Sequence, residues 1–251
     1  MRTAMALIFE TDGGEATLAA LGIIVLQNDE TLEAEFCTIF NHPGVALYHS
    51  RIPSSAEVSR STLLQMEHAL PKAAGLLPNA RPLDVIGYGC TSGATVIGAD
   101  KVATLIQTKH PNTKVTDPIT AVLAACRHLG VSKIGLVTPY IATVSQAMRN
   151  LLEDHQCTIS GFGSFEQAEE SVVARISNRS LFNAICKVGK SDDVEIVFTS
   201  CTNLRSFRII EMAEAAIGKP VISSNQALAW HMIKLAGLSD KMTGPGRLFN
   251  S

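Results

Sequence analysis

Two short stretches of this chain are versions of one another, and each combines an apolar run with a Cys-Thr pair. The first covers residues 84–93 (DVIGYGCTSG) and the second covers residues 195–204 (EIVFTSCTNL). An apolar run that ends in small residues is typical of a buried parallel strand leading into a tight turn. Helical patterns follow, at 96–109 and 206–217. We therefore expect each cysteine to lie at the carboxyl end of a strand, just before a helix.

This position matters because of the chemistry of helix N-termini. Backbone N–H groups and the helix dipole favour an anion there, and they can lower the pKa of a thiol. Cys90 and Cys201 are therefore the candidate reactive thiols of the chain. The other four cysteines (37, 126, 157 and 186) show no CxxC pair and no metal-finger spacing, so we expect neither a metal site nor a disulfide framework.

Other landmarks recur in the same order at nearly constant spacing, which predicts an internal repeat. The separations are 111 residues from Cys90 to Cys201, 113 from Gly22 to Gly135 and 106 from Val115 to Val221. Strands are expected at 21–26, 45–52, 84–88, around 115, 132–140, 156–160, 195–198 and 220–224. Helices are expected from residue 31 and at 59–77, 96–109, 119–129, 142–154, 169–187, 206–217 and 226–235.

Alternating strands and helices predict an α/β fold in which each half has a parallel sheet covered on both faces. We assign residues 1–117 and 219–251 to the first lobe and residues 118–218 to the second. Ligands of such sheets bind beyond the carboxyl ends of the strands. Two pseudo-symmetric lobes can thus bring both cysteine turns to one cleft, where the active site is expected.

Composition narrows the class of protein. The 251 residues carry a net charge of −2 without a basic run, which gives no reason to expect nucleic-acid binding. No apolar stretch reaches the roughly 18–20 residues that cross a bilayer. The N-terminus becomes acidic too early for a secretory signal, so we expect a cytoplasmic protein.

Two thiols on opposite faces of a carbon atom suit proton transfer next to a carboxylate. Such a reaction needs a base on one side, an acid on the other and donors for the developing negative charge. The candidate donors lie beside the cysteines: Gly89, Thr91, Ser92, Gly93, Thr202 and Asn203. Ser92 and Asn203 can also cap the helices expected after the cysteines. Residues 87–90 do not complete a dinucleotide-binding GxGxxG motif, which favours chemistry without a cofactor.

At these residues the chain resembles the aspartate/glutamate racemase superfamily. The resemblance extends from Gly22 through YGCTSG at 88–93, VTPY at 137–140, SCTNLR at 200–205 and KPV at 219–221. The nearest branches are the maleate cis–trans isomerases, the arylmalonate decarboxylases and the ectoine-utilisation racemase-like proteins. The resemblance implies two Rossmann-like lobes, an active site between them and no cofactor.

The resemblance also implies residue roles. Cys90 and Cys201 match the two catalytic cysteines: a nucleophile and a proton-handling thiol in the isomerases, or an exchangeable acid and base in the racemases. Decarboxylases of this fold typically keep only the second cysteine, which speaks against simple arylmalonate decarboxylation. Tyr140 matches a tyrosine that binds the substrate carboxylate, and Thr91 and Thr202 match oxyanion contacts.

Two acidic positions depart from the maleate isomerase pattern. Asp29 stands where those enzymes carry an asparagine in the substrate loop. A carboxylate there repels a dianionic substrate unless it is protonated or paired, and it can instead meet an amino or amide group. A solvated acid at a helix start is the alternative reading of Asp29. A second asparagine of the family falls near Glu170, to which no role is assigned.

The sequence thus predicts a cofactor-independent isomerase or racemase acting on a small carboxylate, with Asp29, Thr91, Ser92, Tyr140, Thr202 and Asn203 around the thiols. Two alternatives stay open: a malonate-type decarboxylase that uses Cys201, and a non-catalytic protein that binds a small acid. A homodimer or higher homo-oligomer is expected, since such assemblies are common among soluble enzymes.

Overall fold

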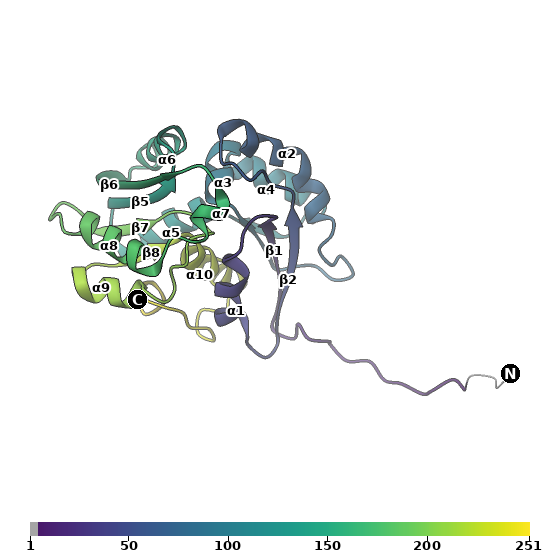
Figure 1. Ribbon diagram of the computed structural model, residues 1–251. Coiled ribbons are helices and arrows are strands. Elements are labelled where there is room, and N and C mark those ends of the chain that lie inside the picture. Colours follow the sequence, from purple (N-terminus) through teal and green to yellow (C-terminus); the bar gives the residue numbers. More distant parts are fainter. Residues whose placement is uncertain (1–4) are drawn as a thin grey trace.

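The computed structural model describes residues 5–251, which form two four-stranded parallel sheets flanked by helices (Figure 1). The sheet orders are β2-β1-β3-β4 and β6-β5-β7-β8, so the same order occurs twice. The first sheet comprises β1 (Ala19–Leu26), β2 (Val45–Ile52), β3 (Val85–Gly89) and β4 (Lys114–Thr116). The second comprises β5 (Lys133–Tyr140), β6 (Thr158–Gln167), β7 (Ile196–Thr199) and β8 (Val221–Ser223). The predicted α/β fold with two repeated parallel sheets is confirmed.

Helices connect successive strands, as parallel pairing requires. They are α1 (Leu32–Phe40), α2 (Arg60–Ala74), α3 (Thr91–Ile97), α4 (Ala99–Gln107), α5 (Pro118–Leu129), α6 (Ala142–Asp154), α7 (Glu170–Val173), α8 (Asn178–Gly189), α9 (Ile210–Ile217) and α10 (Ser224–Ala236), with a 3-10 turn at Arg247–Phe249. In residues 5–251 no helix has the length and apolar character needed to cross a membrane.

Strand β1 shows why the first sheet is buried on both sides. Leu21, Ile23 and Val25 face one hydrophobic cluster, whereas Ala20 and Ile24 face another. This alternation is the two-residue period of a strand. Helices α1 and α10 cover the first face, and α2 with α4 contributes to the second. Every residue of β1 is buried, which accounts for its nearly continuous apolar sequence.

Helix α10 links the two sheets. It follows β8, which pairs with β7 in the second sheet, yet its residues Leu228 and Met232 pack against the first sheet. The prediction assigned residues 219–251 to the first lobe. In the structure, β8 within this range belongs to the second sheet. The remainder of the predicted division stays a prediction, and residues 1–4 lie outside the described residues.

Several predicted elements have different bounds. The helix expected at 96–109 begins already at Thr91, and Gly98 interrupts it with a φ of 93°. The helix expected at 169–187 is divided into α7 and α8. Strand β6 continues past the expected residue 160 to Gln167.

The expected helix 206–217 begins only at Ile210, so Cys201 does not precede a helix directly. The reason is the carboxylate of Glu35 on α1. It accepts hydrogen bonds from the amides of Ser206 (2.6 Å) and Phe207 (2.8 Å), which holds residues 201–209 in an irregular path. The prediction of two equivalent helix starts is thus correct for Cys90 and wrong for Cys201.

The glycines of the repeat occupy matching places in β1 and β5. A Cβ atom on Gly22 would lie 2.8 Å from Cδ1 of Leu77, and one on Gly135 would lie 2.8 Å from Cγ1 of Val188. Each glycine thus allows a side chain to approach the strand backbone. Leu77 comes from the segment before β3, and Val188 comes from α8, before β7.

We expect Gly22→Ala and Gly135→Ala each to lower the free energy of unfolding by about 1–3 kcal/mol, because overpacking strains a dense core. Urea titration followed by circular dichroism measures the effect. Gly75→Ala is the control, since Gly75 has helical dihedral angles and the Pro71 carbonyl oxygen would lie 3.4 Å from the new Cβ. Equal stability of all three variants would contradict the expectation.

Candidate active site

The first cysteine turn is built by the end of β3 and the start of α3. Cys90 is the N-cap residue of α3, and its sulfur accepts a hydrogen bond from the amide of Gly93 (3.1 Å). Gly93 leaves room for this arrangement, since a Cβ there would lie 2.5 Å from the Tyr88 hydroxyl and 2.9 Å from the Cys90 sulfur. The Ser92 hydroxyl lies 3.7 Å from the same sulfur. Cys90, rather than Ser92, therefore caps this helix.

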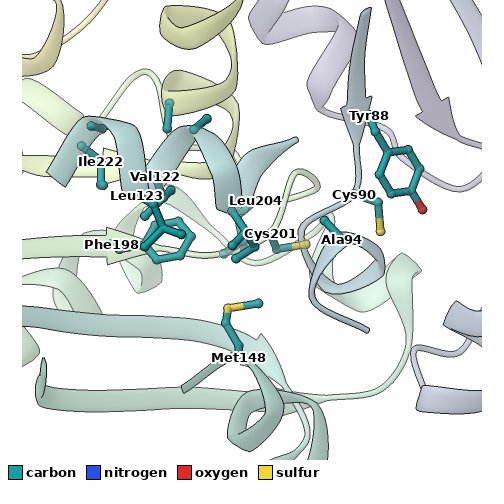
Figure 2. Packing of buried hydrophobic residues seen from close by; sticks show 14 of the residues in the cluster. Tyr88, Cys90, Ala94, Val122, Leu123, Met148, Phe198, Cys201, Leu204 and Ile222 are labelled. Atoms are coloured by element: carbon teal, nitrogen blue, oxygen red, sulfur yellow. The ribbon is translucent and has the colours of Figure 1, made fainter. Parts of the chain in front are cut away.

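The second cysteine turn has a different local structure. Cys201 follows β7 with a φ of 122°, a strained conformation for a residue with a side chain. Its sulfur accepts a hydrogen bond from the amide of Asn203 (3.4 Å). Asn203 lies in an irregular segment and caps no helix, contrary to prediction. The sulfur of Cys201 points toward the turn that carries Cys90 (Figure 2).

One hydroxyl group joins the two turns. The Ser224 oxygen accepts hydrogen bonds from the Thr91 hydroxyl (2.7 Å) and from the Cys201 amide (3.0 Å). A second link runs from the Thr202 hydroxyl to the Gly89 carbonyl (3.4 Å). Ser224 is the first residue of α10, which is capped by Ser223. The two repeated Cys-Thr turns are thus held against each other at a single site.

Tyr140 lies at the end of β5, close enough to both thiols for them to affect its pKa. Burial raises the pKa of Tyr140 well above its usual value, and the neighbouring thiols of Cys201 and Cys90 raise it further. Tyr140 is itself fully buried. Cys90, Cys201 and Tyr140 are thus all buried near the junction of the two turns.

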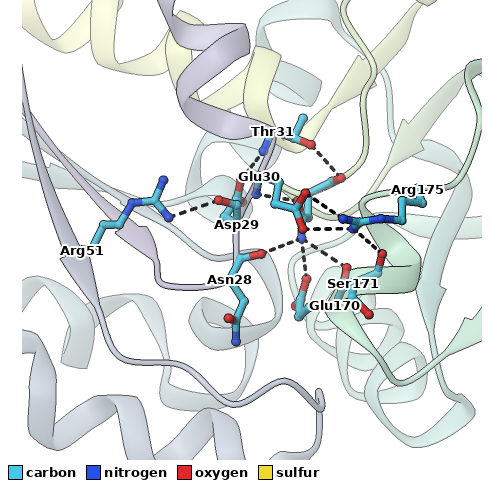
Figure 3. A network of polar contacts seen from close by, with 9 residues as sticks. Asn28, Asp29, Glu30, Thr31, Arg51, Glu170, Ser171 and Arg175 are labelled. Carbon is cyan, nitrogen blue, oxygen red and sulfur yellow. Dashed lines mark hydrogen bonds and ion pairs between the residues drawn. The ribbon is translucent and has the colours of Figure 1, made fainter.

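A pair of carboxyl groups lies beside the thiols, and sequence analysis assigned no role to one of them. Asn203 donates from Nδ2 to Glu170 Oε2 (2.9 Å), and its Oδ1 accepts from the Glu30 amide (2.9 Å). Asp29 accepts through Oδ1 from the amides of Thr31 and Leu32, both at 2.8 Å (Figure 3). Asp29 is thus a buried acid, which rules out the alternative of a solvated helix start.

Burial dominates the electrostatics of both thiols. It raises the pKa of Cys90 to about 12 despite the hydrogen bond from Gly93, and it raises the pKa of Cys201 well above its usual value. The charge of Glu170 adds to both shifts. The predicted lowering of the thiol pKa at a helix start is therefore outweighed by desolvation. At neutral pH the ligand-free site holds two protonated thiols.

Burial also raises the pKa of Glu170 to about 7, and the charge of Asp29 contributes in the same direction. Burial likewise raises the pKa of Asp29. Glu170 thus changes its charge near neutral pH, next to two groups whose own ionisation it opposes.

The site is closed over by contacts between loops of the two lobes. The amide of Val58 donates to the Ala168 carbonyl (2.9 Å), and the amide of Glu170 donates to the Ala56 carbonyl (3.0 Å). An exposed ion pair joins Glu30 to Arg175 at 3.0 Å (Figure 3). Only 2% of Cys90 and 4% of Cys201 are exposed. Both thiols are therefore almost completely shielded from solvent.

The fold and the site together define a two-lobed α/β protein with paired thiols at the junction of its lobes. A sequence model of the family described as arylmalonate decarboxylase matches residues 89–249. The chain therefore belongs to the arylmalonate decarboxylase family, which confirms the superfamily branch indicated by its motifs.

The chain is similar both to maleate isomerases and to an arylmalonate decarboxylase. The maleate isomerase of Nocardia farcinica is 26% identical over 237 residues, covering 91% of this chain and 94% of its own. The arylmalonate decarboxylase of Bordetella bronchiseptica is 31% identical over 133 residues, which is 52% of this chain and 55% of that protein. A maleate isomerase variant of Pseudomonas putida S16, solved with maleate, superposes with a TM-score of 0.84 at 23% identity, covering 92% of this chain and 97% of that one.

We expect Ser224→Ala to lower the free energy of unfolding by about 2–3 kcal/mol, because the buried Cys201 amide and Thr91 hydroxyl each lose a partner. The urea midpoint measures this loss. Ser239→Ala, at an exposed serine after α10, serves as the control. An unchanged midpoint for Ser224→Ala would show that the hydroxyl does not hold the turns together.

The pKa of Glu170 gives a second expectation. A carboxyl group with a raised folded-state pKa contributes stability below its unfolded value of 4.5, and this contribution is lost as the pH rises to about 7. Glu170→Gln should remove this loss. At pH 8 the free energy of unfolding of the variant should therefore exceed that of the parent by up to about 3 kcal/mol. Urea titrations from pH 5 to pH 8 measure it, with Glu169→Gln at the exposed neighbour as control. Parallel pH profiles of parent and Glu170→Gln would refute the assignment.

Proposed function

We propose that the protein is a cofactor-independent isomerase or racemase that acts on a small carboxylate through Cys90 and Cys201. The observation that carries this proposal is that the two repeated turns meet at the Ser224 hydroxyl, with both thiols buried beside this contact. Family membership and full-length maleate isomerase relatives support it. A structural neighbour from N. farcinica is described as holding a covalent succinylcysteine intermediate, which attests cysteine chemistry in that enzyme.

Proton transfer between two thiols accounts for a racemisation. One cysteine, as thiolate, takes the proton from the carbon next to the carboxylate and becomes a thiol. The other thiol donates its proton to the opposite face and becomes the thiolate. Protons balance over the cycle, and the next turnover runs in the opposite direction. For an alkene substrate, Cys90 adds to a carbon of the double bond, rotation follows, and the C–S bond breaks again.

Donors around the thiols can stabilise the charge that develops on the substrate carboxylate. The amides of Thr91 and Ser92 lie in the first turn of α3, where no helical carbonyl is available to them. Thr202 directly follows Cys201, and the Tyr140 hydroxyl is a hydrogen-bond partner of the Cys201 thiol. Such preorganised donors act strongly in a site that excludes water. The substrate-binding roles of Thr91, Ser92, Tyr140, Thr202 and Asn203 belong to this proposal.

A malonate-type decarboxylase is the second candidate, and the family match favours it. In that reaction loss of carbon dioxide leaves a carbanion, and a single thiol, Cys201, delivers a proton to it. Cys90 is not needed for this chemistry. The two candidates therefore differ in their dependence on Cys90.

We expect Cys90→Ser and Cys201→Ser each to lower isomerase turnover by at least about 100-fold, since removal of a positioned acid or base costs 10²–10⁴-fold. NMR measures turnover: solvent deuterium incorporation at the reacting carbon of amino acids, hydantoins and malonates, and cis–trans conversion of maleate. Cys37→Ser, at an exposed cysteine, is the control.

Cys90→Gly separates the two candidates. An isomerase loses activity in this variant, whereas a decarboxylase that relies on Cys201 still releases carbon dioxide from a malonate. Ligand affinity that persists in both serine variants without any turnover would instead indicate a binding protein. Homo-oligomeric assembly and a cytoplasmic location are part of the same proposal.

A further inference from the structure

Two buried carboxyl groups enter the site from opposite lobes. Asp29 lies in the loop between β1 and α1 and is 4% exposed, and Glu170 begins α7 and is 6% exposed. They lie close enough that the charge of Asp29 raises the pKa of Glu170. Asn203 connects the two loops, because its Nδ2 donates to Glu170 Oε2 and to the Asn28 carbonyl.

One oxygen of the Asp29 carboxyl group accepts no hydrogen bond from the described residues. Oδ1 of Asp29 accepts two backbone hydrogen bonds, but Oδ2 is buried and accepts none from residues 5–251. The Thr202 hydroxyl donates to the Gly89 carbonyl (3.4 Å), and it also lies close enough to Asp29 to lower the pKa of that carboxyl group. Buried carboxylate oxygens are normally hydrogen-bonded, so an unpartnered one indicates a place for a donor.

The protein neutralises the pair only in part: the nearby Arg51 guanidinium lowers the pKa of Asp29, but burial outweighs this effect. None of the three ion pairs found within residues 5–251 includes Asp29 or Glu170. Arg51 donates to the Asp29 carbonyl oxygen (3.2 Å) and pairs with Glu33. Arg175 pairs with Glu30 at the surface. A buried charge without a counterion is costly, and a cationic ligand supplies what these side chains do not.

The carboxyl pair lies next to the second thiol, because Asn203 donates its amide to Cys201 Sγ (3.4 Å) and its Nδ2 to Glu170 Oε2 (2.9 Å). The charge of Glu170 raises the pKa of both Cys90 and Cys201, and that of Asp29 contributes at Cys201. A group bound by the pair therefore lies close to the carbon atom between the thiols. A second carboxylate there meets repulsion, whereas an ammonium group forms charge-assisted hydrogen bonds.

We propose that Asp29 and Glu170 bind the ammonium group of the substrate, which is then a small carboxylate bearing a protonated amine, such as an α-amino acid. This inference rests on the proposed two-thiol function and names its substrate class. A bound ammonium offsets part of the negative charge of the carboxylates and so weakens their opposition to a thiolate. Substrate binding thereby favours the ionisation that the chemistry requires. Asp29 and Glu170 select the substrate, and the thiols transfer the proton.

The test compares ligands that differ only at the nitrogen. α-Amino acids, their N-acetyl derivatives and carboxylates with the same chain but no nitrogen are assayed for α-deuterium incorporation and for a shift of the protein's melting temperature. The parent should bind and exchange the free amino acids in preference to the other two classes. Asp29→Asn and Glu170→Gln should raise KM for the amino acid at least 10-fold, with a smaller change in kcat.

Glu169→Gln is the matched control, because this exposed acid adjoins Glu170 without entering the site. Turnover of maleate or of a nitrogen-free carboxylate, with KM unchanged or lowered in Asp29→Asn and Glu170→Gln, would overturn the inference while the proposed function stood. A preference for the N-acetyl derivatives would also overturn the inference. The same holds if no free amino acid shifts the melting temperature of the protein. Exchange that survives Cys90→Ser and Cys201→Ser would instead refute the proposed function itself.

Discussion

The Ser224 hydroxyl is the contact on which the arrangement of the site depends. The two cysteine turns belong to different sheets, and each by itself is an ordinary strand end. Because the Ser224 oxygen accepts from both Thr91 and the Cys201 amide, the turns lie at a fixed distance from each other. The oxygen owes its position to α10, whose capping box fixes the first helical turn and whose apolar residues pack on the first sheet. A single helix thus sets the geometry of both halves of the site.

Desolvation determines the charge state of everything within that site. The thiols, Tyr140, Asp29 and Glu170 all have pKa values raised chiefly by burial, so the closed, ligand-free site favours neutral groups. Glu170, whose pKa is raised to about 7, is the group in this site whose charge changes near neutral pH. Chemistry and recognition are consequently coupled: the group that binds next to the carboxyls also decides whether a thiolate can form.

The sequence predicts the scaffold well because both of its signals are local. Apolar runs with two-residue alternation locate the strands, and the repeated Cys-Thr pair locates the strand ends where Cys90 and Cys201 lie. The path after Cys201 could not be predicted, since it depends on Glu35, a residue of another lobe that captures two amides. Glu170 was missed for the same reason. Nothing in its sequence neighbourhood distinguishes it from the exposed Glu169, and only the packing of α7 against the first lobe buries it.

The place of α10 in the chain also bears on how the protein acquires its fold during synthesis. Leu21, Ile23 and Val25 of β1 are covered by residues such as Leu228 and Met232, which are translated only after both sheets are complete. Until then one face of the first sheet remains an open apolar surface, the kind of surface that chaperones recognise and that aggregates form on. The first lobe therefore cannot mature as an independent unit ahead of the second, and a nascent chain halted before α10 would carry both thiols with neither a finished core nor a finished site.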